Sequence, residues 1–388
     1  MTFLLIIIYI TFISLGLPDS VFGVSWPLMH LDLGLNESLG SFFTILVGIG
    51  AGISSFSSGP LIRKFSTGRV TAFSVLLTAV GLLGYSLSSN IYLLIAFSIL
   101  LGLGAGAVDS GINNFVSLHY KAIHMNWLHC FWGVGVTLSP LIMSHFLSDG
   151  QWRGGYRTIS IAQFAITALL FATLPLWKKA NEKAEIHTAE STADEKLNPL
   201  QILKTKGVMF AILSVGLYCA MEFIVGTWGA SFIVNSKGLP ADSASKWIST
   251  FYFGIMAGRF LSGILSVKMN DKNLIRVGIG GSMLGIILLA LPLGTASLFG
   301  FFLIGFGFAP FFPSTLHATS VRFGKKYSQD ITGFQMGGGY AVAWLIQIIF
   351  GAVASATTFA FLPYLFIIIN VLLLLVTERI NKITAKTQ

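Results

Sequence analysis

The sequence predicts an all-α membrane protein with twelve membrane-spanning helices in two pseudo-symmetric six-helix bundles. Three observations predict this fold: the composition, a regular succession of long apolar segments, and the uneven distribution of basic residues between them. Of the 388 residues, 54% are hydrophobic and only 10% are charged, whereas a soluble domain has about 25% charged residues. Because such a chain has too little polar surface to face water on all sides, we expect lipid to be its solvent.

The apolar segments have the length that a bilayer requires. A membrane-spanning helix needs about 20 mostly apolar residues. The first apolar segment follows no basic region and precedes no small-residue cleavage site, so we interpret it as a retained helix rather than a signal peptide. The predicted spans lie near residues 3–29, 37–61, 69–88, 92–117, 125–147, 158–177, 207–234, 242–267, 274–293, 297–320, 331–353 and 357–377.

A polar stretch divides these spans into two sets of six. We therefore predict an N-terminal bundle at residues 1–177, a cytoplasmic linker at 178–206 and a C-terminal bundle at 207–388. An offset of 203 residues aligns Asp19 with Glu222, and the same offset aligns two Gly-X-Gly segments of corresponding helices. This similarity indicates an internal duplication, and two such halves are the architecture of a rocking transporter.

The basic residues predict the orientation in the membrane. If the N-terminus is cytoplasmic, 19 of the 24 Lys and Arg residues fall on the cytoplasmic side of the predicted spans. Only Arg153, Arg157, Lys237 and Lys246 fall on the outer side. Cytoplasmic loops of membrane proteins carry this excess of Lys and Arg. We therefore expect both termini to be cytoplasmic and the protein to reside in the cell membrane.

Several classes of function are excluded by what the sequence lacks. The net charge of +9 is explained by membrane topology, so no nucleic-acid partner is expected. The two cysteines, Cys130 and Cys219, both lie in apolar segments, which argues against a disulfide framework. The sequence contains no phosphate-binding loop, HExxH motif or Cys/His metal spacing. We therefore expect no enzymatic activity, metal or cofactor, and a monomer whose partners are a small solute and the bilayer.

Two acidic residues of the first half lie inside apolar segments, where a charge costs at least about 2.5–3.5 kcal/mol. Asp19 follows Pro18 in LGLPDSVFG, where a kink would let it face a cavity. Asp109 shares one helical face with Asn113, and Asn114 lies about 100° further round. We expect these acids to bind solute or a coupling cation, with Asn113 and Asn114 as solute ligands. The alternative is hydrogen bonding between helices, which buried polar residues also provide.

The second half carries a corresponding set. Glu222 aligns with Asp19 and is a candidate for solute binding or coupling. Trp228 could stack on the apolar face of a sugar, or could be one of the tryptophans that are common near membrane interfaces. Arg259 lies in the half of its helix that we expect to be cytoplasmic, where gating by ion pairing is favoured over direct contact with solute.

Four further residues are weaker candidates for solute binding: His129, Trp132, Gln335 and Tyr340. His129 could relay protons, although a hydrogen-bonded histidine near a helix end is the alternative. Gln335 lies at the start of the eleventh predicted span, in the segment GFQMGGGY, whose glycines indicate close packing or a hinge.

Several of these segments resemble a known family. The six-plus-six layout and the basic loop GPLIRKFSTGR resemble the major facilitator superfamily over essentially the whole chain, although the usual Asp before the basic pair is absent. More narrowly, LGLPDSVFG, GLGAGAVDSGINN, WLHCFWGVG, YCAMEFIVGTWGASF and GRFLSG resemble the fucose/galactose/glucose:cation symporters. In fucose permease, acids of helices 1 and 4 serve sugar recognition and proton coupling, and Asp19 and Asp109 match their positions. Because Asp replaces the familiar Glu in helix 4, the resemblance leaves the substrate open.

These observations lead to one functional hypothesis and two alternatives. We expect a secondary transporter that moves a small polar solute, such as a monosaccharide, by cation symport with alternating access. Its coupling ion is expected to be H⁺, with Na⁺ as the alternative. A proton-coupled exporter of amphipathic or lipid-like compounds would use the same acids. A membrane receptor is disfavoured because the short loops leave no sizeable soluble domain.

Overall fold

The computed structural model describes residues 2–120, 122–177, 199–324 and 328–385. Within these ranges, twelve helical segments are long and apolar enough to cross a membrane, as the sequence predicts. The chain divides into two compact units, which are described separately. Unit 1 comprises Met1–Ser191 and Leu239–Ser249, and unit 2 comprises Thr192–Gly238 and Thr250–Gln388.

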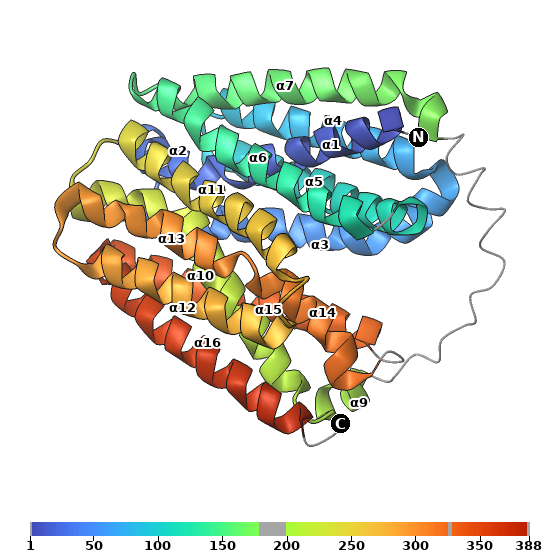
Figure 1. Ribbon diagram of the computed structural model, residues 1–388. Coiled ribbons are helices and arrows are strands. Elements are labelled where there is room, and N and C mark those ends of the chain that lie inside the picture. The colour runs from blue at the N-terminus through green and yellow to red at the C-terminus, as the bar shows by residue number, and fades with distance from the viewer. Residues whose placement is uncertain (1, 121, 178–198, 325–327, 386–388) are drawn as a thin grey trace. The chain divides into compact units, whose positions relative to one another are not determined.

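Unit 1 contains the first six spans, and neighbouring helices run lengthwise against one another, as α4 and α7 do in Figure 1. Its elements are α1 (Thr2–Asp19), α2 (Val21–Asp32), η1 (Glu37–Leu39), α3 (Gly40–Phe65), α4 (Thr67–Leu87), α5 (Ile91–His119), α6 (Ala122–Leu147) and α7 (Trp152–Ala172). The beginning of α11 (Ala241–Leu265) also belongs to unit 1, because Ser245 and Ser249 donate hydrogen bonds to carbonyls of α6 at 2.6 and 2.8 Å.

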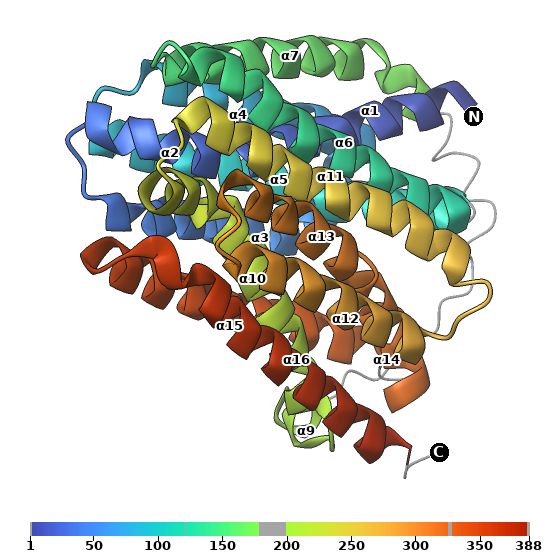
Figure 2. The ribbon, with the colours of Figure 1, turned by 60° about the vertical axis from the view of Figure 1, so that its left-hand side comes forward.

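Unit 2 contains the remaining spans. Its elements are α9 (Pro199–Lys204), α10 (Val208–Lys237), the rest of α11, α12 (Asp271–Ala290), η2 (Gly294–Leu298), α13 (Phe299–Phe308), α14 (Phe311–Phe323), α15 (Ser328–Ala356), η4 (Phe359–Phe361) and α16 (Leu362–Thr384). The helix pairs α10–α15 and α12–α13 make the most extensive contacts of this unit. Figure 2 shows α12 alongside α16, which also packs on α10.

Close helix packing in unit 1 depends on glycines, which have no side chain to hold neighbouring helices apart. A Cβ atom at Gly102 would lie 2.1 Å from the Val47 carbonyl oxygen, and one at Gly106 would lie 2.0 Å from that of Ala51. Lipid offers no hydrophobic drive for pairing of helices, so close approach at small residues provides the contact. Gly102 and Gly106, which precede Asp109, therefore join α5 to α3.

Two boundaries of the predicted spans are wrong by six or seven residues. The sixth span begins at Trp152 rather than near residue 158, because Trp152 is buried and Arg153 forms an ion pair with Asp32 at 2.5 Å. The last helix continues to Thr384 rather than ending near 377. Both extensions contain polar residues, so a search for continuous apolar segments does not include them.

Two predicted single helices are broken. The first span consists of α1 and α2, which meet at Ser20, and the tenth consists of α13 and α14, which meet at Ala309 and Pro310. Proline lacks the N–H that a continuous helix requires. In the predicted linker, residues 199–204 form α9, whereas 178–198 lie outside the described residues.

Candidate functional site

The break between α1 and α2 positions Asp19 near the middle of the first span. Helix α1 contains Pro18 and ends at Asp19, at the place where the sequence predicts a kink. The Ser20 hydroxyl donates to the Val136 carbonyl at 2.7 Å, and the Ser139 hydroxyl donates to the Leu17 carbonyl. Helix α6 therefore supplies hydrogen-bond partners at the break, as lipid-embedded backbone requires.

Two glycines bring α1 and α6 together beside this break. A Cβ atom at Gly16 would lie 2.4 Å from the Trp132 carbonyl oxygen, and one at Gly135 would lie 2.2 Å from the Ile13 carbonyl oxygen. This close contact allows Trp132 Nε1 to donate a hydrogen bond to Asp19 Oδ2 at 2.8 Å. The structure thus brings together two residues that the sequence predicted separately.

Asp109 lies on α5 with Asn113 one turn further along. Asn113 Nδ2 donates to Asp109 Oδ1 at 2.8 Å and to the Asp109 carbonyl at 3.0 Å. The amide is neutral, so it holds the carboxylate oxygen without neutralising its charge. The side chain of Asn114, also predicted as a ligand, lies outside the described residues.

Both acidic residues are exposed, although several residues close to them in the sequence are buried. Asp19 is exposed although Leu17, Ser20 and Val21 are buried. Asp109 is exposed although Val108 is 1% exposed. In an apolar span, such selective exposure of the one ionisable side chain is unlike core packing, because core packing would exclude the carboxylate from any accessible space.

His129 lies two turns inside α6, deeper than the sequence predicted, because the helix begins at Ala122. Its ring meets Phe12 edge to face, with 5.8 Å between the ring centroids. Another histidine of this helix, His124, forms a hydrogen bond of 2.9 Å with the Tyr9 hydroxyl. Both histidines therefore contribute to packing of α1 against α6.

In unit 2, Glu222 lies near the middle of α10, about 21 Å along the helix axis from its first residue. Both Glu222 and Arg259, the latter from α11, interact electrostatically with Tyr218 and Cys219. Glu222 and Arg259 are each half-buried. Glu222 therefore lies near a permanent cation. Asp109 differs from it, because its side-chain partner among the described residues is the neutral Asn113 amide.

An aromatic wall adjoins this polar group. Tyr218 is 1% exposed and stacks on Phe311 with 5.1 Å between the ring centroids. Tyr218 was not predicted from the sequence, although its position one turn before Glu222 places both on one helical face. Tyr340 of α15 is half-buried and packs against Phe223 at 5.8 Å between centroids.

Two predicted solute ligands of unit 2 are buried in its packing. Trp228 is fully buried against Phe359 and Gly351, where an added Cβ would lie 2.3 Å from the indole. Gln335 is also fully buried, and its Oε1 accepts a hydrogen bond of 2.7 Å from Thr319. Neither side chain offers a surface to a solute in this arrangement, so we reassign both to helix packing.

Sequence reasoning also missed two buried polar pairs. Ser14 donates to Gln163 Oε1 at 2.5 Å, which joins α1 to α7, and Gln347 Nε2 donates to Thr227 at 2.8 Å, which joins α15 to α10. Each glutamine interrupts an apolar run, and that interruption is the signal that could have found them. Among the described residues, no group of three or more His, Cys, Asp or Glu side chains could hold a metal ion.

The twelve candidate spans define a polytopic helical membrane protein. The family model of the Major Facilitator Superfamily matches residues 8–348, so the chain belongs to that superfamily and is not an enzyme.

Relatives and solved structures agree with this assignment. The glucose/mannose transporter GlcP of Bacillus subtilis (strain 168) is 24% identical over 300 residues, which cover 74% of this chain and 73% of that protein. The hexuronate transporter of the same organism is 23% identical over 275 residues, covering 67% and 64%. The nucleoside transporter NupG has a TM-score of 0.76 at 16% identity, covering 97% of this chain and 98% of the other. The D-xylose-proton symporter has a TM-score of 0.75 at 13% identity, covering 98% and 97%.

Proposed function

We propose that this transporter moves a monosaccharide by cation symport with alternating access, and that the coupled ion is H⁺, with Na⁺ as the alternative. The observation that carries the proposal is the exposure of Asp19 and Asp109 within apolar spans, beside the buried Ser20 and Val108. An aspartate facing lipid at mid-bilayer would cost about 2.5–3.5 kcal/mol or more. A wetted solute path removes that cost.

The two acids differ in their partners, and the proposed roles follow from this difference. Asp109 is paired with the neutral Asn113 amide, so protonation of the carboxylate would break no ion pair formed among the described residues. We assign proton or cation coupling to Asp109. Asp19 accepts the indole N–H of Trp132, and a carboxylate beside an aromatic ring suits recognition of sugar hydroxyls, so we assign solute binding first to this pair.

Glu222 and Arg259 are proposed to act together in unit 2. An acid and a base that both act on Tyr218 form a charge-balanced group, which costs less inside a membrane than either charge alone. Movement of Arg259 away from this group would change the balance, and for this reason we propose a gating role for Arg259. His129 and Tyr340, both half-buried, complete the proposed set.

A sugar as the solute is supported by the relatives. Those whose names specify a substrate include a glucose/mannose transporter and a hexuronate transporter. We also propose membership of the fucose/galactose/glucose:cation symporter group, residence in the cell membrane and cytoplasmic termini. The excess of Lys and Arg on one side of the predicted spans supports this orientation.

The test is counterflow in proteoliposomes with a panel of labelled hexoses, pentoses and hexuronates, each with and without a pH or sodium gradient. The proposal predicts exchange of at least one neutral sugar and its accumulation under one of the gradients. Lipophilic cations and a fluorescent phospholipid form the comparison panel. Exchange of these compounds with no exchange of any sugar would refute the proposal and favour an exporter.

A further inference from the structure

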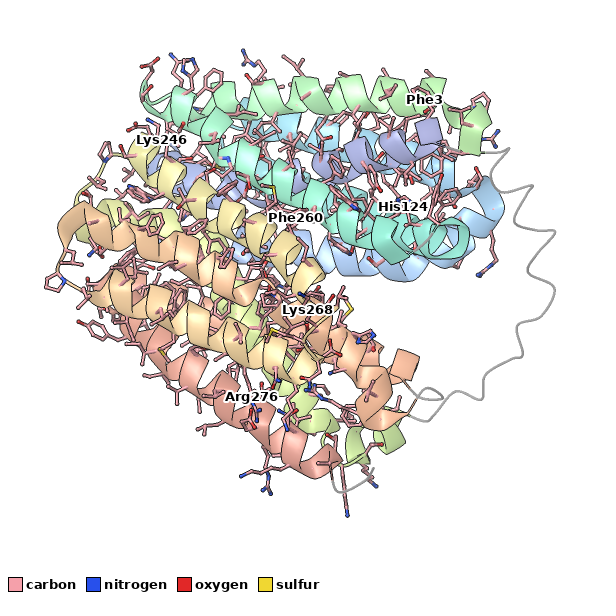
Figure 3. All side chains as sticks on the ribbon, viewed as in Figure 1. Phe3, His124, Lys246, Phe260, Lys268 and Arg276 are labelled. Carbon is pink, nitrogen blue, oxygen red and sulfur yellow. The ribbon has the colours of Figure 1, made fainter. Side chains whose placement is uncertain are left out.

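We propose that the seam between α12 and α16, at the end that carries Lys272 and Arg379, binds the headgroup of an anionic phospholipid. The inference concerns the surface of unit 2 alone and needs no knowledge of the transported solute. Figure 3 labels Lys268 and Arg276, which lie at this end of the unit.

A network of polar contacts fixes the three helices that meet here. Arg276 of α12 binds Glu378 of α16 through two parallel hydrogen bonds, Nε to Oε1 at 2.6 Å and a terminal nitrogen to Oε2 at 2.7 Å. His317 of α14 contacts Asp271 of α12 at 2.7 Å, and Arg322 of α14 donates to Asn381 of α16 at 3.1 Å. The acids at this end are therefore already engaged by residues of neighbouring helices.

Cations remain in excess around this network. The side chains Lys268, Lys272, Arg379 and Lys382 are exposed. None of them takes part in the ion pairs formed among the described residues, although Lys272 lies close enough to Glu378 to interact with it electrostatically. Since Arg276 and Glu378 balance each other, the seam carries a surplus of positive charge from two different helices.

Exposed apolar side chains lead directly into these cations. On α16, the residues Ile368, Leu372 and Leu375 are all exposed and continue at spacings of four, three, four and three to Arg379 and Lys382. Residues with these spacings share one helical face. In a bilayer this stripe contacts acyl chains, so Arg379 and Lys382 come to lie at the level of the lipid headgroups.

Helix α12 contributes its cation from a different face. Val277 and Leu284 are 58% and 67% exposed, but Lys272 is five and twelve positions away from them and so lies about 120–140° round the helix. A lipid whose acyl chains lie on the α16 stripe would therefore place its phosphate beside Arg379 and Lys382, with Lys272 near Glu378 as the contribution of α12. Basic clusters of this kind between membrane helices are suited to anionic headgroups.

The test is the thermal stability of the purified full-length protein in a neutral detergent, titrated with phosphatidylglycerol, phosphatidylcholine or glycerol 1-phosphate. The test variant combines Lys272→Gln, Arg379→Gln and Lys382→Gln. The matched control removes three basic residues of unit 1, by Arg63→Gln, Lys64→Gln and Arg69→Gln. Native mass spectrometry counts the retained lipids in parallel.

Phosphatidylglycerol is expected to stabilise the wild type and the control, and the test variant should need about tenfold or more of it for half of the effect. Phosphatidylcholine and glycerol 1-phosphate should have little effect on any form. The charge-conserving variant Lys272→Arg, Arg379→Lys and Lys382→Arg should respond like the wild type, which separates loss of lipid from damage to the fold.

Three results would overturn the proposal. The first is an equal loss in the test variant and the control, which would indicate general attraction to anionic surfaces. The second is an unchanged response of the test variant. The third is an equal effect of glycerol 1-phosphate, which would indicate a site for a soluble anion.

Discussion

The substitution Gly135→Ala tests how the helix packing of unit 1 holds Asp19. An added Cβ would lie 2.2 Å from the Ile13 carbonyl oxygen and 3.0 Å from the Gly16 Cα atom. Because real Cβ atoms essentially never approach closer than 3.0 Å and ordinary contact begins at 3.4 Å, α1 and α6 must separate by about 0.8–1.2 Å. That movement would lengthen the 2.8 Å bond from Trp132 to Asp19 to about 3.6–4.0 Å, beyond hydrogen-bonding distance.

We expect Gly135→Ala to lower the free energy of unfolding by about 1–3 kcal/mol, as overpacking does, and to impair counterflow of the sugar. Trp132→Phe should impair counterflow to a similar degree with a smaller loss of stability, because it removes the indole N–H but keeps an aromatic ring and does not force the two helices apart. The control is Gly52→Ala, where an added Cβ meets nothing within 4 Å. The reasoning is refuted if Gly135→Ala matches this control in both thermal unfolding and counterflow.

Two further predictions concern stability. Ser14→Ala removes the hydroxyl that donates to buried Gln163 and should lower the free energy of unfolding by about 0.6–1.7 kcal/mol, the range for hydrogen bonds between membrane helices. The control is Ser57→Ala, whose exposed hydroxyl donates to its own helix and which should show no comparable loss in thermal unfolding. Equal losses in the two variants would contradict the prediction. Reversing one charge of the partly exposed pair Arg276–Glu378 should lower the unfolding temperature, and reversing both charges should restore it. The expected coupling free energy between the two residues is about 0.2–1 kcal/mol. Absence of any recovery in the double variant would show that the pair does not join α12 to α16.

Most of the fold could be predicted from the sequence because lipid imposes one rule along the whole chain. Each span must be a helix of about 20 apolar residues, and this rule finds twelve of them. It fails at Trp152, where a helix continues into polar residues that bind Asp32. The kink at Pro18 could be predicted because proline acts locally.

The partners within the site could not be predicted in the same way. Trp132 and Asp19 are separated by 113 residues, and only the packing of Gly16 against α6 brings them together. The sequence was equally compatible with stacking of Trp228 on a sugar and with its packing in the core. Gly351, which accommodates the indole ring, is distant in sequence, so this contact could not be predicted. Asp109 and Asn113 were predictable because one helical turn relates them.

The most direct test of the central claim is gradient-driven uptake by Asp109→Asn in proteoliposomes, compared with counterflow by the same preparation. A symporter moving one proton per sugar should accumulate the sugar about tenfold under a pH difference of one unit without a membrane potential, since a free energy of about 1.4 kcal/mol corresponds to a factor of ten. We predict that Asp109→Asn retains counterflow but reaches a sugar ratio of about one. Accumulation near tenfold by this variant would contradict the assignment of coupling to Asp109.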